Sequence, residues 1–279
     1  MLIAVFCKEY GYTLYVALCD TGLEYPEIRI FAEANAKRIA EKYGINMVFV
    51  RLRPDMNFRD VLIEYGYPVI SKEVSKIVYG ARHSKDKKQS YINKLKGLNP
   101  DGSYSEYKQQ YEILLQAPFE ISNRCCVKMK EQPAMRYEME TGKKPIVATM
   151  ADESKQRLDG WCKTGCNAFD SDRPMSKPIS FWTEQDVLTM ILQEHIEIAS
   201  VYGKVVKDYQ KIGQTNGQMS LADFGFAMDA IPLKTTGCDR TGCIFCGYGC
   251  HLDKGISRFQ RLKETHEKLY NYCIGGGEF

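Results

Sequence analysis

The sequence predicts an α/β protein in which helices cover both faces of a parallel sheet. Short apolar runs alternate with helical patterns over the first 66 residues, and the helices between them provide the long connections that parallel strands require. The 279 residues are 44% hydrophobic, which is enough to bury a core in one large or two small domains.

The first strand is expected over residues 13–19, where TLYVALC is apolar and rich in β-forming residues. This run stops at Asp20-Thr21-Gly22, a polar turn. A long helical pattern then runs from Pro26 to Tyr43, and Gly44 is placed to end it. The order is strand, loop, helix.

Further elements follow the same alternation. Met47–Leu52 is expected to be a second buried strand, and Asn57 can cap a helix over Phe58–Tyr65 that closes at Gly66. The run PIVATM over residues 145–150 is expected to be a third strand.

The polarity rises after residue 69, and we expect about residues 69–116 to form a lid or insertion outside the core. Thr183 and Asp186 have the spacing of a capping box before an apolar helix over Val187–Leu192. We therefore divide the chain into an α/β domain over residues 1–200 and a cysteine-rich segment over residues 201–279.

Charge and hydropathy exclude several classes of protein. The net charge is 38 − 35 = +3, and no apolar run approaches the ~18 residues of a membrane span. The N-terminus lacks the basic region and cleavage site of a signal peptide, so we expect a soluble, cytoplasmic protein without membrane partners. The short basic run Lys85–Lys88 is expected to be a solvated loop, and a nucleic-acid partner is not indicated.

The eleven cysteines are many for a cytosolic chain, and their odd number argues against a fully paired disulfide framework. Four of them follow a glycine-rich metal-site spacing: Cys238-x4-Cys243-x2-Cys246-x3-Cys250. Zinc and an iron–sulfur cluster are both compatible with this spacing.

A second cluster places adjacent thiols, Cys125 and Cys126, beside Lys128 and Lys130. Adjacent cysteines chelate one zinc ion awkwardly, whereas in a cubane cluster they can bind different iron atoms. The lysines would offset the negative charge of a thiolate-ligated cluster. The pair therefore favours [4Fe–4S] over zinc.

These residues resemble the signatures of a known family. Cys19-Asp20-Thr21-Gly22-Leu23-Glu24-Tyr25-Pro26-Glu27 resembles the DTGxExPET signature of the sulfonucleotide reductases, which act on adenylyl sulfate (APS) or phosphoadenosine phosphosulfate (PAPS). Cys125-Cys126-x-x-Met129-Lys130-x-x-Pro133 is similar to their CCxxRKxxPL motif, and Gly242-Cys243-Ile244-Phe245-Cys246 to their distal GCxxC pair. Residues 151–157 and 178–187 resemble the family's nucleotide loop and its PLxxWxxxDV segment.

The resemblance implies a doubly wound parallel sheet of the adenine nucleotide alpha-hydrolase type and an iron–sulfur oxidoreductase of sulfur metabolism. The implied cluster ligands are Cys125, Cys126, Cys243 and Cys246, with Cys238 or Cys250 able to replace one of them. The implied nucleotide-site residues are Asp20, Thr21, Gly22, Lys72, Arg82, Lys130, Glu153, Ser154 and Arg157. The Cys243 segment is expected to fold back toward Cys126, and Asp20–Gly22 and Glu153–Arg157 to share one edge of the sheet.

Two family features are absent from the sequence. Residues 1–10 look like the helix that follows the phosphate-binding SGGxDS loop, and neither that loop nor the central strand before it is present. The C-terminal ECGLH-type nucleophile is also missing, because the surroundings of Cys273 do not match it. We therefore expect a fragment of a longer protein that turns over neither APS, PAPS nor ATP appreciably.

Three functions are consistent with these motifs. The leading one is binding of an adenine sulfonucleotide for reduction or sulfur transfer, with a thiol electron donor such as thioredoxin as a partner. The second is an ATP pyrophosphatase-type sulfurtransferase similar to the cluster-bearing subunit of DNA phosphorothioation systems. The third is a non-catalytic nucleotide-binding protein.

Overall fold

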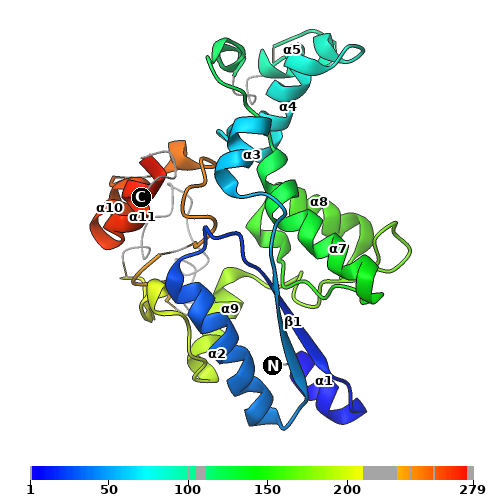
Figure 1. Ribbon diagram of the computed structural model, residues 1–279, viewed down its shortest axis with the longest axis vertical. Helices are drawn as coiled ribbons and strands as arrows, with labels where there is room; N and C mark the ends of the chain where they lie inside the picture. The colour runs from blue at the N-terminus through cyan, green and yellow to red at the C-terminus, as the bar shows by residue number, and fades with distance from the viewer. Residues whose placement is uncertain are drawn as a thin grey trace, which may run out of the picture. The chain divides into compact units, whose positions relative to one another are not determined.

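The computed structural model of the chain describes residues 2–99, 101–104, 111–209, 231–238, 240–253 and 255–274. It is a mixed α/β protein with small parallel and antiparallel sheets (Figure 1). The chain forms two compact units. Unit 1 comprises Met1–Tyr25, Asn35–Tyr137 and Gly242–Phe279, and unit 2 comprises Pro26–Ala34 and Glu138–Thr241. The segment from Gly242 onward thus belongs to the same unit as the N-terminal part of the chain. The sequence-based division at residue 200 places them in separate parts.

A strand–helix–strand element opens the chain after helix α1 (Leu2–Tyr10). Strand β1 (Leu14–Cys19) pairs in parallel with β2 (Met47–Leu52), and α2 (Pro26–Tyr43) connects them. Gly44 ends α2 in the left-handed conformation, at φ 63°, where its N–H reaches the last carbonyls of the helix. These three predicted elements are confirmed.

Helix α3 (Phe58–Tyr65) is also confirmed, and the Asn57 side chain caps it by accepting a hydrogen bond from the Asp60 amide at 2.9 Å. The chain continues through α4 (Lys72–His83), α5 (Lys88–Leu95) and the short 3₁₀ turn η1 (Glu112–Gln116).

The segment over residues 69–116, expected to be a lid or insertion, contains buried apolar residues. Val78, Ala81 and Leu95 are buried together with Ile121 in a hydrophobic cluster of their own. The segment is polar overall, but the apolar residues of α4 recur at Val74, Val78 and Ala81, so one face of the helix is apolar. Average polarity concealed this periodicity.

Replacing Leu95 by alanine tests this local core. Leu95 is 1% exposed, and truncating a buried leucine leaves a cavity that costs about 2–5 kcal/mol. We expect the free energy of unfolding in urea to fall by that amount for Leu95→Ala. Leu252→Ala is the matched control because Leu252 is 68% exposed and should cost little. Equal stabilities for the two variants would contradict the described core.

The remaining helices of unit 1 carry or support cysteines. A continuous helical stretch is formed by α6 (Arg124–Cys126), a π-helical turn η2 (Val127–Glu131) and α7 (Gln132–Thr141). After the short turn η7 (Cys250–Leu252), the chain forms α10 (Arg258–Thr265) and α11 (Glu267–Ile274).

Unit 2 contains short strands and helices. The helical elements are η3 (Ala151–Glu153), α8 (Lys155–Thr164), α9 (Glu184–Gln193) and η4 (Ser200–Tyr202). The strands form two antiparallel pairs, β3 (Asn167–Ala168) with β4 (Met175–Ser176) and β5 (Val205–Lys207) with β6 (Leu233–Thr235). The predicted capping box of Thr183 and Asp186 is present at the start of α9.

The predicted third strand over residues 145–150 is not formed. Within unit 2 this segment makes a single bridge, between Ile146 and Ser176, and so has no ladder of strand hydrogen bonds. The predicted edge shared by Asp20–Gly22 and Glu153–Arg157 stays a prediction, because the two segments belong to different units. Apolar composition favours extended backbone, but a strand also needs a partner.

No helix in the described part of the chain combines the length and the apolar character needed to cross a membrane.

Candidate functional site

Cys125 and Cys126 lie in the short helix α6, where their Sγ atoms are 4.0 Å apart. Cys125 is 6% exposed and packs with Val61 of α3 and with Met129 in a small hydrophobic cluster. The π-helical turn η2 follows directly and changes the helical register after Cys126. Such turns interrupt α-helices frequently at functional sites.

The segment over residues 67–70 connects this helix to the C-terminal cysteines. Tyr67 forms a parallel bridge with Ile121, just before α6, and Ile70 forms one with Tyr248. The Gly249 amide donates to the Ile70 carbonyl at 2.8 Å. The segment therefore contacts both cysteine-bearing parts of unit 1.

The turn that carries Cys243 and Cys246 is fixed by close packing. Phe245 lies between Phe58 and Phe259, with ring centroids 6.3 and 5.6 Å away. A Cβ atom on Gly247 would overlap the Pro68 carbonyl oxygen, so this approach requires glycine.

The same turn is bonded to the loop after β1. The Ile244 amide donates to the Leu23 carbonyl at 2.8 Å, and the side chains of Leu23, Ile244 and Leu262 form a buried cluster. The Asp20-Thr21-Gly22-Leu23-Glu24 loop and the distal cysteine pair thus form one site.

The four sulfurs interact electrostatically. A hydrogen bond from Cys125 lowers the pKa of Cys126 to about 6 against the effect of burial, and Lys72 and Lys130 contribute to the lowering. The same hydrogen bond, burial and the charges of Cys126, Cys246 and Cys243 raise the pKa of Cys125. These interactions favour the thiolate of Cys126, which is the form that binds metals.

Two lysines approach these thiols. Burial lowers the pKa of Lys130, but the charges of Cys243 and Glu24 and a hydrogen bond with Cys243 outweigh it and raise the pKa above its usual value. Lys72 forms an ion pair with Glu131 at 2.7 Å and also lies in the field of Cys126 and Cys125. Positive charge is thus placed beside the thiols, as predicted from Lys130.

The loop after β1 bonds mainly to itself. Glu24 accepts hydrogen bonds from the Thr21 amide at 3.0 Å and the Thr21 hydroxyl at 2.7 Å, and the Gly22 amide donates to Asp20 at 3.3 Å. These bonds occupy the amides that could have cradled a phosphate. The charge of Glu24 also acts on Lys130 and helps to raise its pKa.

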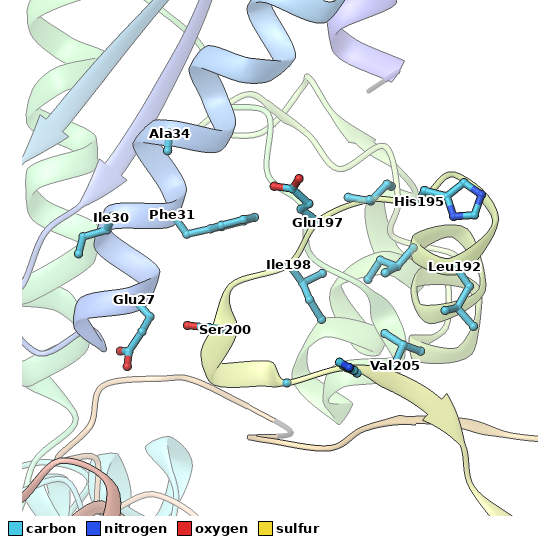
Figure 2. A pocket seen from close by; sticks show the side chains of 14 residues that line it. Glu27, Ile30, Phe31, Ala34, Leu192, His195, Glu197, Ile198, Ser200 and Val205 are labelled. Carbon is cyan, nitrogen blue, oxygen red and sulfur yellow. The ribbon is translucent and has the colours of Figure 1, made fainter.

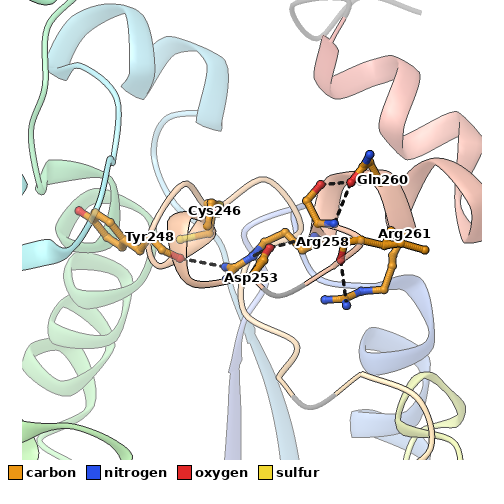
Figure 3. Close-up of polar contacts among 9 residues, drawn as sticks. Cys246, Tyr248, Asp253, Arg258, Gln260 and Arg261 are labelled. Atoms are coloured by element: carbon orange, nitrogen blue, oxygen red, sulfur yellow. Dashed lines mark hydrogen bonds and ion pairs between the residues drawn. The ribbon is translucent and has the colours of Figure 1, made fainter.

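An ion pair stabilises the turn after Cys246 (Figure 3). Arg258 donates to both Asp253 carboxylate oxygens, at 3.1 and 2.8 Å, and a third hydrogen bond reaches the Tyr248 carbonyl at 2.9 Å. Hydrogen bonds from the Arg258 side chain and amide lower the pKa of Asp253 to about 2.

This shift predicts a pH-dependent stability. An Asp whose pKa lies below the unfolded value of about 3.9 stabilises the fold above that pH and loses the effect as the pH falls toward 2. We expect Asp253→Asn to unfold at lower urea concentration than the parent at pH 7, with the difference closing between about pH 4 and 2. Exposed Asp172→Asn is the control, and an equal, pH-independent loss in both variants would contradict the ion pair.

Arg82, predicted to reach the substrate sulfate, is engaged elsewhere. Its guanidinium donates to the carbonyls of Leu114, Leu115, Ala117 and Phe119 and pairs with Glu120. These bonds hold the chain after η1 against α4. Within unit 1, Lys72 and Lys130 lie near the cysteines. The guanidinium N–H groups of Arg82 instead stabilise the backbone after η1.

The predicted nucleotide residues of unit 2 form a local cap. Ser154 caps α8 by accepting from the Arg157 amide at 3.3 Å, and Glu153 pairs with the Arg157 guanidinium. Burial, and then the charge of Arg240, lower the pKa of Arg157. Their role in binding a nucleotide stays a prediction.

The other cysteines differ in position. Cys250 donates to the Cys246 carbonyl at 3.2 Å and so lies beside the four-cysteine site, whereas Cys238 belongs to unit 2. Cys273 packs in the cluster of Leu23 and Leu262, and burial raises its pKa to about 11. A thiol of that kind is a poor nucleophile near neutral pH.

No group of three or more His, Cys, Asp or Glu side chains in the described ranges is arranged to hold a single metal ion. Unit 2 contains a separate open pocket of about 860 Å³ between the start of α2 and residues 191–205. Phe31 and Ile198 point into it from its two sides (Figure 2). None of the predicted site residues lines this pocket.

No protein-family model and no curated protein matches the chain. The functional interpretation therefore depends on the motifs and on the site geometry.

Sequence reasoning missed two residues of this site. Glu24 was quoted in the loop motif without a role, although an acidic residue after Asp-Thr-Gly is a candidate partner for a lysine. Tyr248 carried no signal beyond its place between Cys246 and Cys250.

Proposed function

We propose that this chain is an iron–sulfur protein of the PAPS reductase family that binds an adenine sulfonucleotide beside a [4Fe–4S] cluster. The observation that carries the proposal is the approach of Cys125 and Cys126 to Cys243 and Cys246, with Lys130 between Cys243 and Glu24. Two cysteine pairs more than a hundred residues apart in sequence would not otherwise need to share one site.

The donor set fits a thiolate-ligated cluster. Four thiols supply soft ligands, and Lys72 and Lys130 offset the negative charge they acquire on deprotonation. When bound, the cluster would supply a centre that can exchange an electron and hold charge next to the substrate. Zinc on the same thiols is the alternative, and metal analysis distinguishes the two.

Lys130 would bind the anionic group of the nucleotide. Its ammonium has three hydrogens, and Cys243 and Glu24 orient it, so a further hydrogen can be donated to a phosphate or sulfate oxygen. The β1–α2–β2 element supports a doubly wound sheet, since ligands of such folds bind at the carboxyl ends of the strands, where Asp20 follows β1.

The half-buried Cys273 favours a second candidate, a protein that binds the nucleotide without turnover. A thiol with a pKa of about 11 in a hydrophobic cluster cannot readily attack sulfur. This candidate keeps the cluster and Lys130 and removes the reductive step.

The test begins with anaerobic purification of the full chain. We expect about four iron and four sulfide per chain and a brown colour that fades in air. Calorimetry with APS, PAPS and ATP then gives the bound nucleotide. Sulfite release with reduced thioredoxin supports the reductase, pyrophosphate release from ATP supports the sulfurtransferase, and binding without either supports the non-catalytic protein. Stoichiometric zinc without iron or sulfide would reject the cluster.

A further inference from the structure

Positive charge is concentrated in one part of unit 1, the neighbouring helices α4 and α5 (Figure 1). Residues 72–96 contain eight Lys and Arg against two Asp and Glu, a net charge of 8 − 2 = +6. The whole chain carries +3, so the remaining residues together carry 3 − 6 = −3. Such an uneven distribution of charge is typical of proteins that bind a polyanion.

Four exposed lysines of this region have no charged partner among the described residues. They are Lys76, Lys85, Lys87 and Lys88, and we call them the lysine patch. Their ammonium groups form neither ion pairs nor hydrogen bonds there, whereas Lys96 pairs with Glu112 at 3.3 Å. Three of the four lie at or just before the start of α5, the end of a helix that carries partial positive charge, so their charges oppose the helix dipole. These charges therefore do not stabilise the fold.

Two stacked rings lie on the same face of α4 as Lys76. Tyr79 and His83 are three and seven residues after Lys76, and these spacings place side chains on one face of a helix. Their ring centroids are 4.3 Å apart with the planes at 23°, and His83 Nδ1 donates to the Tyr79 carbonyl at 3.0 Å. The His83 side chain is still 45% exposed. A ring that is held in place and exposed in this way can stack on a nucleobase.

The same face of α4 adjoins the helical stretch that carries the first cysteine pair. The Arg124 guanidinium lies 5.9 Å from the centre of the Tyr79 ring, and Arg124 directly precedes Cys125. Lys72, one turn before Lys76, pairs with Glu131 at 2.7 Å. A chain of phosphates bound along this face of α4 would therefore pass close to the cysteine site.

We propose that the lysine patch and the His83 ring bind single-stranded nucleic acid, with the lysines on phosphates and the ring stacked on a base. Ammonium groups are point charges that bind phosphate oxygens without reading the sequence. Bases are free to stack on a protein ring in a single strand but not in a duplex, so the exposed ring favours a single strand. The inference goes beyond the proposed function and does not depend on the cluster.

Two other anionic partners fit these observations less well. Protein interfaces are depleted in lysine and enriched in arginine, whereas Arg82, the arginine of α4, is bonded to backbone carbonyls. An anionic lipid surface would attract the lysines through charge alone and would leave the exposed ring without a role. The run Lys85–Lys88 by itself indicates only a solvated loop. Lys76 and the two rings of α4 supply the further evidence for nucleic acid.

The test measures binding of a fluorescent oligothymidylate of about 20 nucleotides to the full chain by anisotropy, from about 50 to 200 mM salt. We expect the triple variant Lys85→Ala/Lys87→Ala/Lys88→Ala to bind at least about tenfold more weakly at the lowest salt. The slope of log affinity against log salt should also fall by about 2, because each phosphate contact in a single strand contributes about 0.7 to that slope.

A second triple variant, Lys8→Ala/Lys163→Ala/Lys268→Ala, is the matched control. These lysines are also exposed, and the variant loses the same charge from other helices. Its affinity and salt slope should stay close to those of the parent. An equal loss of affinity in the two triple variants would reduce the effect to net charge and overturn the inference.

His83 separates stacking from charge. We expect His83→Ala to weaken binding about fivefold or more, because stacking on an aromatic side chain contributes to the affinity for each base. His83→Phe keeps a ring without a charge and should restore the binding. A parent protein that binds no oligothymidylate at the lowest salt, that binds a duplex of equal length as tightly, or that binds only phosphatidylserine vesicles overturns the inference. Iron and sulfide analysis is a separate measurement, so either proposal can fail without the other.

Discussion

Cys126→Ser is expected to reduce the iron and sulfide content of the anaerobically purified protein to background. The hydrogen bond from Cys125 and the charges of Lys72 and Lys130 lower the pKa of Cys126, which favours the thiolate that binds metal. A serine hydroxyl is a poor ligand for iron, which prefers the thiolate that Cys126 supplies. Cys125→Ser, Cys243→Ser and Cys246→Ser should behave alike.

Three further cysteines provide the controls. Cys162→Ser changes an exposed thiol and should leave the iron content unchanged. Cys238→Ser tests the alternative ligand set, because loss of iron in this variant would place Cys238 among the ligands. Cys250→Ser is the sharper comparison because Cys250 lies against Cys246. Loss of iron in Cys250→Ser with retention in Cys243→Ser would reassign the fourth ligand.

Local signals in the sequence predicted the ends of several helices well. Each of these signals lies within one turn of the helix end that it caps, so neighbouring residues are enough to predict it. The signals are Gly44, Asn57 and the Thr183–Asp186 pair. The failure at residues 145–150 has the opposite cause. A strand forms only where a second segment pairs with it, and that segment can lie far away in the sequence. Ile146 pairs with Ser176 in an isolated bridge, so residues 145–150 do not form a strand.

In the site, too, features set by neighbouring residues were predicted, and features set by contacts between distant residues were not. The cysteine spacings marked the four thiols, and the resemblance marked Lys130. The roles of Glu24 and Tyr248 depend on contacts across the chain, between Glu24 and Lys130 and between Tyr248 and Ile70, which no spacing encodes. The positive charge of Arg82 suggested that it binds an anion. In the structure its guanidinium donates hydrogen bonds to backbone carbonyls, among them those of Ala117 and Phe119.

Lys130→Ala is expected to weaken binding of APS or PAPS about 10- to 150-fold, because a hydrogen bond to a charged group contributes about 1.5–3 kcal/mol. The Lys130 ammonium lies near Glu24 and Cys243. No other described contact of this side chain would replace its hydrogen bond to the nucleotide. Calorimetry at fixed ionic strength measures the loss, and iron analysis checks that the cluster is retained. Lys130→Arg should keep part of the affinity.

Lys128→Ala is the matched control for this change. Lys128 is two residues away and carries the same charge, but its ammonium lies over the Tyr65 ring at 4.8 Å. If the two alanine variants lost affinity equally, the effect would be one of net charge, and the placement of Lys130 between Glu24 and Cys243 would not explain binding. If Lys130→Ala lost iron while Lys130→Arg kept it, the lysine would serve the cluster before the nucleotide. A selective loss in Lys130→Ala with intact iron would assign the anion contact to this side chain.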